Sequence, residues 1–159
     1  MGLGLVAGLL LLAVIRIALE PAIPSIGIRI ARAGTLPVWR RASIIYVAAV
    51  GEELLFRLLL LSAIAGLATR GLRSPAQMPK SPVVWLASVF SALAFAAVHL
   101  PAWSGATSLS QGLAMSILIL NALAGVLLGY VFVTRGIVAA IWTHAGADCA
   151  IQLLGPLTG

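Results

Sequence analysis

The sequence contains very little charge, and acidic side chains are the scarcest of all. Only four residues are Asp or Glu, only two are His, and charged residues make up 9% of the 159 positions. Soluble domains carry about 25% charged residues, so this chain has too few to cover a water-facing surface. Hydrophobic residues make up 62% of the chain, and the mean hydropathy is +1.13. These values exclude an ordinary soluble domain and indicate a membrane protein.

Other absences narrow the class further. A single cysteine, Cys149, cannot form an intramolecular disulfide. Aromatic residues make up only 6% of the chain, and there are no alternating ten-residue segments, so an outer-membrane β-barrel is not expected. The net charge is +6, but no charge-rich face could follow a phosphate backbone, so nucleic acid is not an expected partner. The basic residues are expected to set the topology and to contact lipid headgroups of the bilayer.

Five apolar runs are long enough to cross a bilayer as helices. The length allows about five or six spans of roughly 20 residues, and we predict an all-α, polytopic transmembrane bundle that forms one domain over residues 1–159. The first run is expected to be a retained span, because no basic region precedes it as in a signal peptide. The predicted spans are 3–19, 43–68, 83–100, 112–133 and 137–154.

The connections between these runs contain the usual breaking residues. The 20–41 segment contains prolines, glycines and four arginines, so we interpret it as a basic connection that is partly interfacial. Pro101 is expected to end the third span, and Arg135 and Gly136 mark a tight turn before the fifth. The excess of basic residues in 20–41 favours placing that segment in the cytoplasm, with the protein in the inner or plasma membrane.

Three of the four acidic residues and both histidines lie inside the apolar runs. An ionisable residue is costly in hydrocarbon, so each one is by default a hypothesis of function. Together they predict a polar site buried within the helix bundle. The groups are Glu52-Glu53-x-x-x-Arg57, Phe95-x-x-x-His99 and His144-x-x-x-Asp148.

The depths of these groups allow a shared site. At 1.5 Å per residue, Glu52 lies about 14 Å into its span from Ser43. The third span returns and places His99 near the same membrane face, and the fifth returns with His144 near mid-depth. We therefore predict one site that opens toward the 20–41 segment, which would place it on the cytoplasmic side.

The two glutamates are expected to differ in role. Glu53 and Arg57 are separated by four residues and can pair on one helical face, whereas no basic residue lies at helical spacing from Glu52. Glu52 is therefore a candidate general base. The alternative is that both glutamates are neutralised in a packing network. Phe95 precedes His99 by one turn and could pack against the imidazole, although a lone histidine is more often a satisfied core residue.

His144 and Asp148 also lie on one helical face, where the carboxylate could orient the imidazole or form a purely structural hydrogen bond. With Glu52 and His99, they could activate a water molecule and stabilise an oxyanion. The same four residues could instead ligate Zn²⁺ or another divalent cation, although H-E-x-x-H is absent. A rhomboid-like serine protease using Ser104 and His144 is less favoured, because the first position of G-x-S-G is not glycine.

Two features of the fourth span concern packing. Gly125-x-x-x-Gly129 allows close approach of two helices, and we expect it to serve packing within the chain rather than dimerisation. Asn121 is interpreted as hydrogen-bonding glue between helices, with a minor part in the polar site as the alternative.

The three motifs, in this order and on separate spans, resemble the CPBP family of intramembrane proteases. That family includes CAAX prenyl endopeptidases of the Rce1 type and bacterial Abi proteins linked to bacteriocin processing and self-immunity. The resemblance covers about residues 43–153, which would be a protease-like core. It implies an intramembrane endopeptidase that acts on a membrane-associated protein or peptide, either a prenylated CAAX-type substrate or a leader-type peptide.

The resemblance also implies roles for the motif residues. Glu52 would activate water together with His99, while His144 and Asp148 would support the water or the tetrahedral oxyanion. Glu53 and Arg57 would hold the helix geometry. Family members with Asn at the last motif position could donate an amide hydrogen there. Asp148 would instead have to be protonated, orient His144 or bind a cation.

Two other classes of function remain open at this point. Buried Glu, His and Asp residues also occur in proton or cation carriers, although no repeat or pair of broken helices is evident here. A non-catalytic immunity or scaffold protein could retain the same residues without turnover.

Overall fold

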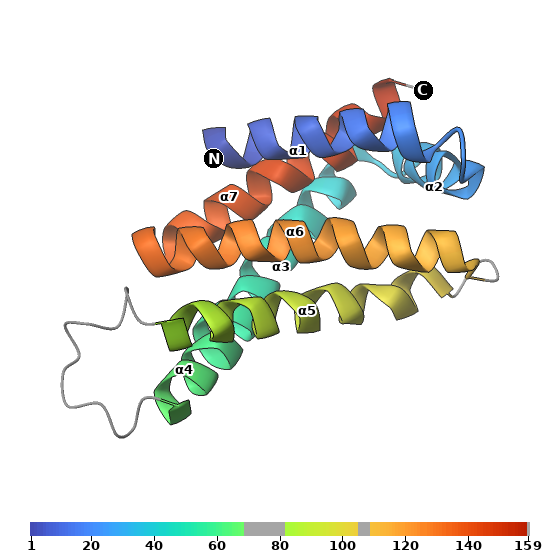
Figure 1. Cartoon of the computed structure of the whole chain (residues 1–159). Helices are drawn as coiled ribbons and strands as arrows, with labels where there is room; N and C mark the ends of the chain where they lie inside the picture. Colours follow the sequence, from blue (N-terminus) through green and yellow to red (C-terminus); the bar gives the residue numbers. More distant parts are fainter. Residues whose placement is uncertain (69–81, 105–108, 159) are drawn as a thin grey trace.

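The computed structural model describes residues 1–68, 82–104 and 109–158, without the side chains of 102–104. Every regular element in this described part is helical, as the sequence predicted. Within these described ranges, four helices are long and apolar enough to cross a membrane. They cover Gly2–Leu19, Pro82–Pro101, Gln111–Arg135 and Ile137–Leu157. The chain is therefore a polytopic helical bundle (Figure 1).

The second predicted span, 43–68, lies within one continuous helix built from three consecutive segments. These are α3 (Val38–Glu53), the π-helical segment η2 (Leu54–Leu61) and α4 (Ser62–Ala68). The helix begins at Val38, five residues before the predicted Ser43, with Pro37 in the N-cap position. The change from α to π winding occurs immediately after the two glutamates. Single turns of π-helix are frequent at functional sites.

The 20–41 segment is more ordered than a connection. After α1 (Gly2–Val14) and its π-helical extension η1 (Ile15–Leu19), Pro24 begins a helix, α2 (Pro24–Gly34). Proline favours the first helical position because its missing N–H would have no intrahelical partner there. Two isoleucines of α2 pack against η1 and the start of α6 (Gln111–Arg135). This cluster contains Ile15, Ile26, Ile30, Leu113 and Ile117.

The third span was predicted to stop before Pro101, and this boundary was wrong. Helix α5 runs from Pro82 to Ser104 and includes Pro101. A proline removes one i→i−4 hydrogen bond, which costs most in the middle of a helix. Here it stands in the last turn. The predicted turn after α6 is confirmed, because Gly136 has a φ of 85°, a conformation that favours glycine.

Small residues allow the closest helix contacts. α5 and α6 run side by side (Figure 1), and a Cβ added to Gly125 would lie 2.9 Å from the Cα of Ala92. The Gly125-x-x-x-Gly129 motif therefore serves packing within the chain, as predicted. α1 crosses α7 (Ile137–Cys149), where a Cβ on Gly8 would lie 2.5 Å from the carbonyl oxygen of Ala147. α7 continues as η4 (Ala150–Leu154) and η5 (Gly155–Leu157).

Polar and apolar side chains are distributed as expected for a protein in lipid. Ile17 and Leu10 are 80% and 65% exposed, whereas Glu53 and Arg57 are 0% and 1% exposed. Apolar side chains face outward at little cost in hydrocarbon, while buried ionisable groups need partners inside the bundle. The composition and this distribution agree that the chain is an integral membrane protein.

Candidate active site

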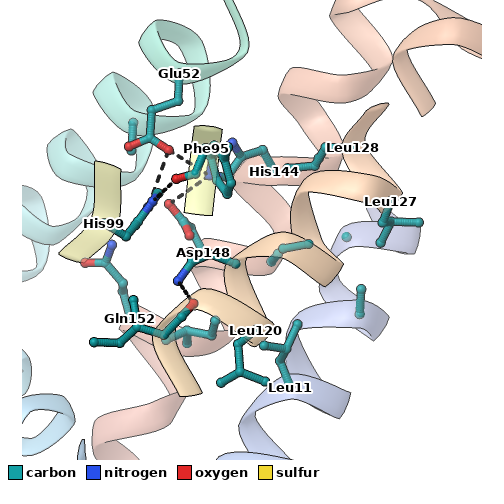
Figure 2. A pocket seen from close by; sticks show the side chains of 18 of the residues that line it. Leu11, Glu52, Phe95, His99, Leu120, Leu127, Leu128, His144, Asp148 and Gln152 are labelled. Carbon is teal, nitrogen blue, oxygen red and sulfur yellow. Dashed lines mark hydrogen bonds and ion pairs between the residues drawn. The ribbon is translucent and has the colours of Figure 1, made fainter. Parts of the chain in front are cut away.

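Three helices bring the predicted site residues together, as expected from their similar depths in the predicted spans. Glu52 comes from α3, His99 from α5, and His144 and Asp148 from α7. Glu52 Oε2 lies 3.8 Å from His99 Nε2 and 3.7 Å from His144 Nε2. Asp148 Oδ2 lies 3.8 Å from the same His144 nitrogen. Figure 2 shows all four side chains turned toward one another.

These groups line a cavity of about 460 Å³ in the interior of the bundle. Helices α1, α2, α3, α5, α6 and α7 all contribute to its wall. In Figure 2 the ionisable side chains gather at one side, and Leu11, Leu120, Leu127 and Leu128 lie at the other. The cavity thus joins a polar cluster to a larger apolar space. The wall of the cavity includes Ile26 of α2. The cavity therefore reaches the 20–41 segment, toward which the site was predicted to open.

Glu53 makes the contact that the sequence did not reveal. Its Oε1 accepts a hydrogen bond from Nδ1 of His144 at 2.9 Å, across 91 residues of chain. The side chain is completely buried. A hydrogen bond to one ring nitrogen fixes the orientation of an imidazole and which nitrogen carries the hydrogen. Glu53 is thus positioned to orient His144 through one ring nitrogen, while Asp148 lies 3.8 Å from the other ring nitrogen.

Arg57 holds this arrangement in place. Its Nη1 lies 3.3 Å from Glu53 Oε1, which confirms the predicted pair. Its Nη2 donates to the carbonyl oxygen of Gly125 at 3.2 Å, and its guanidinium lies 4.5 Å from the ring centroid of Phe95. A guanidinium over an aromatic face is attracted by the ring quadrupole. Arg57 thus connects the glutamate helix to α5 and α6.

Phe95 packs against His99, as its spacing predicted. The ring centroids are 4.7 Å apart, and His99 Nδ1 lies 2.7 Å from the carbonyl oxygen of Phe95. A carbonyl can only accept a hydrogen bond, so Nδ1 carries the hydrogen and donates it. In the neutral imidazole this leaves Nε2 as an acceptor. That acceptor faces Glu52.

Glu52 is the more accessible of the two glutamates. Its side chain is 31% exposed, whereas that of Glu53 is 0% exposed. Yet the Oε2 atom of Glu52 is buried and has no hydrogen-bond partner among the described residues. A buried carboxylate oxygen needs a donor, and the unprotonated His99 Nε2 cannot supply one. The arrangement therefore suits a small hydrogen-bond donor, such as water, between these atoms.

The predicted metal site is not formed by this arrangement. Over residues 1–68, 82–104 and 109–158, no group of three or more His, Cys, Asp or Glu side chains is placed so that it could hold a metal ion. Zinc binds nitrogen and oxygen ligands at about 2.0–2.2 Å, which brings neighbouring donor atoms closer than the separations seen here.

Asn121 was expected to form a hydrogen bond between two helices, but the hydrogen bond described for it stays within its own helix. Its Nδ2 donates to the carbonyl oxygen of Ile117 on the same helix at 2.8 Å, and the residue lines the cavity. Gln152, which the sequence analysis did not single out, also lines the cavity. It follows Asp148 by four residues, and that spacing could have identified it. The Ser104 hypothesis concerns a side chain outside those described.

The comparisons with known proteins decide the family. The model of the type II CAAX prenyl endopeptidase Rce1-like family matches residues 34–150. The chain belongs to this family. The match contains all three motifs and confirms the resemblance seen in the sequence. Neither the curated proteins nor the solved structures contain a match to the chain.

Membership in the Rce1-like family supports a membrane-embedded peptidase that acts on protein substrates. The matched region includes α3 to α7, which carry every ionisable residue of the site. Helix α1 and most of α2 lie outside it, although both contribute to the cavity wall.

Proposed function

We propose that this Rce1-like protein is an intramembrane endopeptidase in which Glu52 and His99 activate the attacking water. The observation that carries the proposal is the pair of facing acceptors. Glu52 Oε2 has no hydrogen-bond partner among the described residues and lies 3.8 Å from His99 Nε2. Polar atoms more than 3.5 Å apart are commonly bridged by water.

A water molecule between these atoms is oriented for attack. It donates one hydrogen to Glu52 and the other to His99, so its lone pairs point into the cavity. Attack on a peptide carbonyl transfers a proton from the water to Glu52 and forms a tetrahedral oxyanion. Glu52 then gives that proton to the leaving nitrogen as the C–N bond breaks. The products are a carboxylic acid, which then releases its proton to water, and an amine.

His144 and Asp148 stabilise the oxyanion in this scheme. With Nδ1 donating to Glu53, a protonated His144 directs its Nε2–H toward the site. Asp148 Oδ2 lies 3.8 Å from that nitrogen, and a protonated Asp148 supplies a second donor. Hydrogen-bond donors aimed at developing negative charge are often the largest contribution to the rate of acyl transfer. In this scheme Asp148 takes the place of the amide of those family members that have Asn at the last motif position.

The apolar part of the cavity suits a substrate with a lipid chain. Pockets of about 300–1,000 Å³ accept small organic groups, and this cavity measures about 460 Å³. Its leucines offer apolar contact on the side opposite the ionisable groups (Figure 2). We propose a prenylated CAAX-type protein or peptide as the substrate, cleaved at the membrane face. A leader-type peptide with an apolar segment is the other substrate that this cavity fits.

The decisive experiment is peptide cleavage by purified protein in detergent, comparing wild type with Glu52→Gln. Farnesylated CAAX peptides and apolar leader peptides serve as substrates, each with and without a chelator. We expect Glu52→Gln to lower kcat by at least about 10³-fold, as general-base removal commonly does. The melting temperature should change little, because Glu52 Oε2 has no hydrogen-bond partner among the described residues and lies 3.7–3.8 Å from the two histidines.

Other outcomes have distinct meanings. Equal cleavage by wild type and Glu52→Gln would refute the role of Glu52. Loss of cleavage in the chelator arm alone would show that a metal is needed. If folded wild type cleaves neither class of peptide, ion flux in liposomes tests whether the buried carboxylates serve a carrier instead.

A further inference from the structure

Most neutral hydrogen-bond donors in the cavity are already used within the protein. Besides the ionisable residues, four polar side chains line the cavity. Three of them, Ser116, Asn121 and Thr143, each donate to the carbonyl oxygen four residues earlier on their own helix. The fourth is Gln152, and no hydrogen bond of its side chain is found among the described residues. Its amide is therefore available to a ligand.

The ionisable residues of the site donate into the cavity only when they are protonated. His99 and His144 each direct Nδ1 at a protein oxygen, so in their neutral forms the Nε2 atoms accept hydrogen bonds. Asp148 donates only as a carboxylic acid. The amide of Gln152 carries two N–H donors whatever the protonation of its neighbours. It is a permanent donor in a site whose other donors depend on protons.

Gln152 is placed so that its side chain faces the ionisable cluster. It lies in η4, four residues after Asp148. A helical side chain leans toward the N-terminal end of its helix and covers the preceding turn, which here carries Asp148. In Figure 2 Gln152 lies on the side of the cavity that holds His99 and Asp148, away from Leu127 and Leu128.

The backbone of Gln152 is fixed to the helix that carries the candidate general base. Nη1 of Arg41 donates to the carbonyl oxygen of Gln152 at 2.9 Å, across 111 residues of chain. Arg41 and Glu52 both belong to α3. The bond therefore sets where the Gln152 side chain begins relative to Glu52. A donor that is held in place before the reaction needs no reorganisation when charge develops.

We propose that the side-chain amide of Gln152 donates a hydrogen bond to the tetrahedral oxyanion of peptide hydrolysis. The inference rests on the proposed peptidase function and adds a permanent donor to His144 and Asp148. As the water oxygen bonds to the carbonyl carbon, an electron pair of the C=O bond moves onto its oxygen, beside the Gln152 N–H. The pair returns to form C=O again when the C–N bond breaks. The amide itself neither gains nor loses a proton.

The test is Gln152→Met, because methionine is similar in length but has no N–H donor. Gln152→Leu is the second variant and serves if Gln152→Met fails to fold. The matched control is Gln111→Met, the same substitution at an exposed residue of α6 that does not line the cavity. Melting temperatures in detergent identify the variants that fold.

Cleavage and binding are both measured on these variants. Cleavage uses the peptides offered to the wild type above. Binding is compared for two ligands of the same sequence. One is the substrate peptide, bound to protein that also carries Glu52→Gln. The other is a phosphinate peptide, bound to protein with Glu52 intact. Its tetrahedral anionic group imitates the oxyanion, and such analogues report interactions made in the transition state.

We expect Gln152→Met to lower kcat about 10²-fold and to change KM by less than about threefold. The removal of one oxyanion donor commonly has an effect of this size on kcat. Affinity for the phosphinate should fall by about the same factor as kcat/KM, whereas affinity for the substrate peptide should change little. Gln111→Met should match the wild type in all of these measurements.

Two results would overturn the inference. One is an unchanged kcat in folded Gln152→Met. The other is an equal loss of affinity for the peptide and the phosphinate, which would indicate ground-state binding or packing. Neither result affects the proposed peptidase as long as Glu52→Gln abolishes cleavage. If wild type cleaves no peptide and binds the phosphinate no more tightly than the substrate, both proposals fail.

Discussion

At the scale of single residues, two adjacent glutamates have separate tasks. Glu53 is fully buried and is held by Arg57 and His144, whereas Glu52 is 31% exposed and faces His99. On a helix, neighbouring side chains point about 100° apart, so the pair can serve two environments. One carboxylate stabilises the site and the other is available to react. This separation predicts that neither glutamate can replace the other.

The buried Glu53–Arg57 pair gives the first stability prediction. Glu53→Leu leaves the Arg57 guanidinium without its carboxylate in a buried position. Breaking a buried ion pair by removing one partner costs about 3–5 kcal/mol, whereas replacing both partners with apolar residues is often neutral. We expect Glu53→Leu to lower the free energy of unfolding by that amount and Glu53→Leu/Arg57→Leu to recover most of it. Denaturant unfolding in detergent measures both.

The double variant should recover stability but not enzymatic activity. The double variant regains stability but still lacks the acceptor for His144 Nδ1, so its kcat should remain at least about tenfold below wild type. Recovery of both stability and activity in the double variant would show that Glu53 serves packing alone. Glu52→Gln is the control, since it should lose activity without a comparable loss of stability.

The residue spacings predicted some of these contacts and could not predict others. Glu53–Arg57, Phe95–His99 and His144–Asp148 are each four residues apart, so helical geometry alone places each pair on one face. The Glu53–His144 hydrogen bond joins residues 91 apart. It depends on how α3 and α7 are oriented about their axes, which no local spacing specifies. The depth argument placed both residues near one level, but it could not choose between the two glutamates.

At the scale of elements, π-helical segments follow the site carboxylates. Segment η2 begins at Leu54, directly after Glu53, and η4 begins at Ala150, two residues after Asp148. A π turn takes in an extra residue and shifts the face that the following helix presents. A membrane span is apolar on nearly all sides, so its sequence has no polar stripe whose position would reveal such a shift. For this reason the sequence located the spans but not the changes in their winding.

The contact between α1 and α7 gives an element-scale prediction. A methyl group at Gly8 would lie 2.5 Å from the carbonyl oxygen of Ala147, a backbone atom that cannot rotate away. Gly8→Ala should therefore push α1 and α7 apart beside Asp148. We expect kcat/KM for peptide cleavage to fall about tenfold or more, and the melting temperature to fall by several degrees, since overpacking costs about 1–3 kcal/mol.

The matched control lies on the same helix. Gly2→Ala places its methyl group where no atom lies within 4 Å. It should leave activity and melting temperature close to those of wild type. If Gly8→Ala behaves like Gly2→Ala, then α1 is not packed against α7 as described, and it does not help to position the site.

At the scale of the whole molecule, the fold separates an apolar exterior from an ionisable interior. The long apolar runs predicted this separation. In lipid, each run must satisfy its backbone hydrogen bonds by forming a helix, and it must turn its few polar side chains inward. The direction in which the bundle crosses the membrane is a different matter. It depends on the difference between short basic segments, and those on the two sides partly balance each other. Orientation is therefore predicted only from the larger number of arginines in 20–41.

Successive spans cross the membrane in opposite directions, so the predicted orientation can be tested with two single-cysteine variants, one for each side. Thr35 lies between α2 and α3, and Thr134 lies in the last turn of α6. In Figure 1 the start of α3 and the C-terminal end of α6 lie toward opposite sides of the bundle. Both threonines are exposed. With Cys149 replaced by Ser, Thr35→Cys should resist a membrane-impermeant maleimide in intact cells and react after lysis. Thr134→Cys should react in intact cells. The reverse pattern would place the Glu52 end of the cavity toward the outer side, and substrates would then have to be presented from outside the cell.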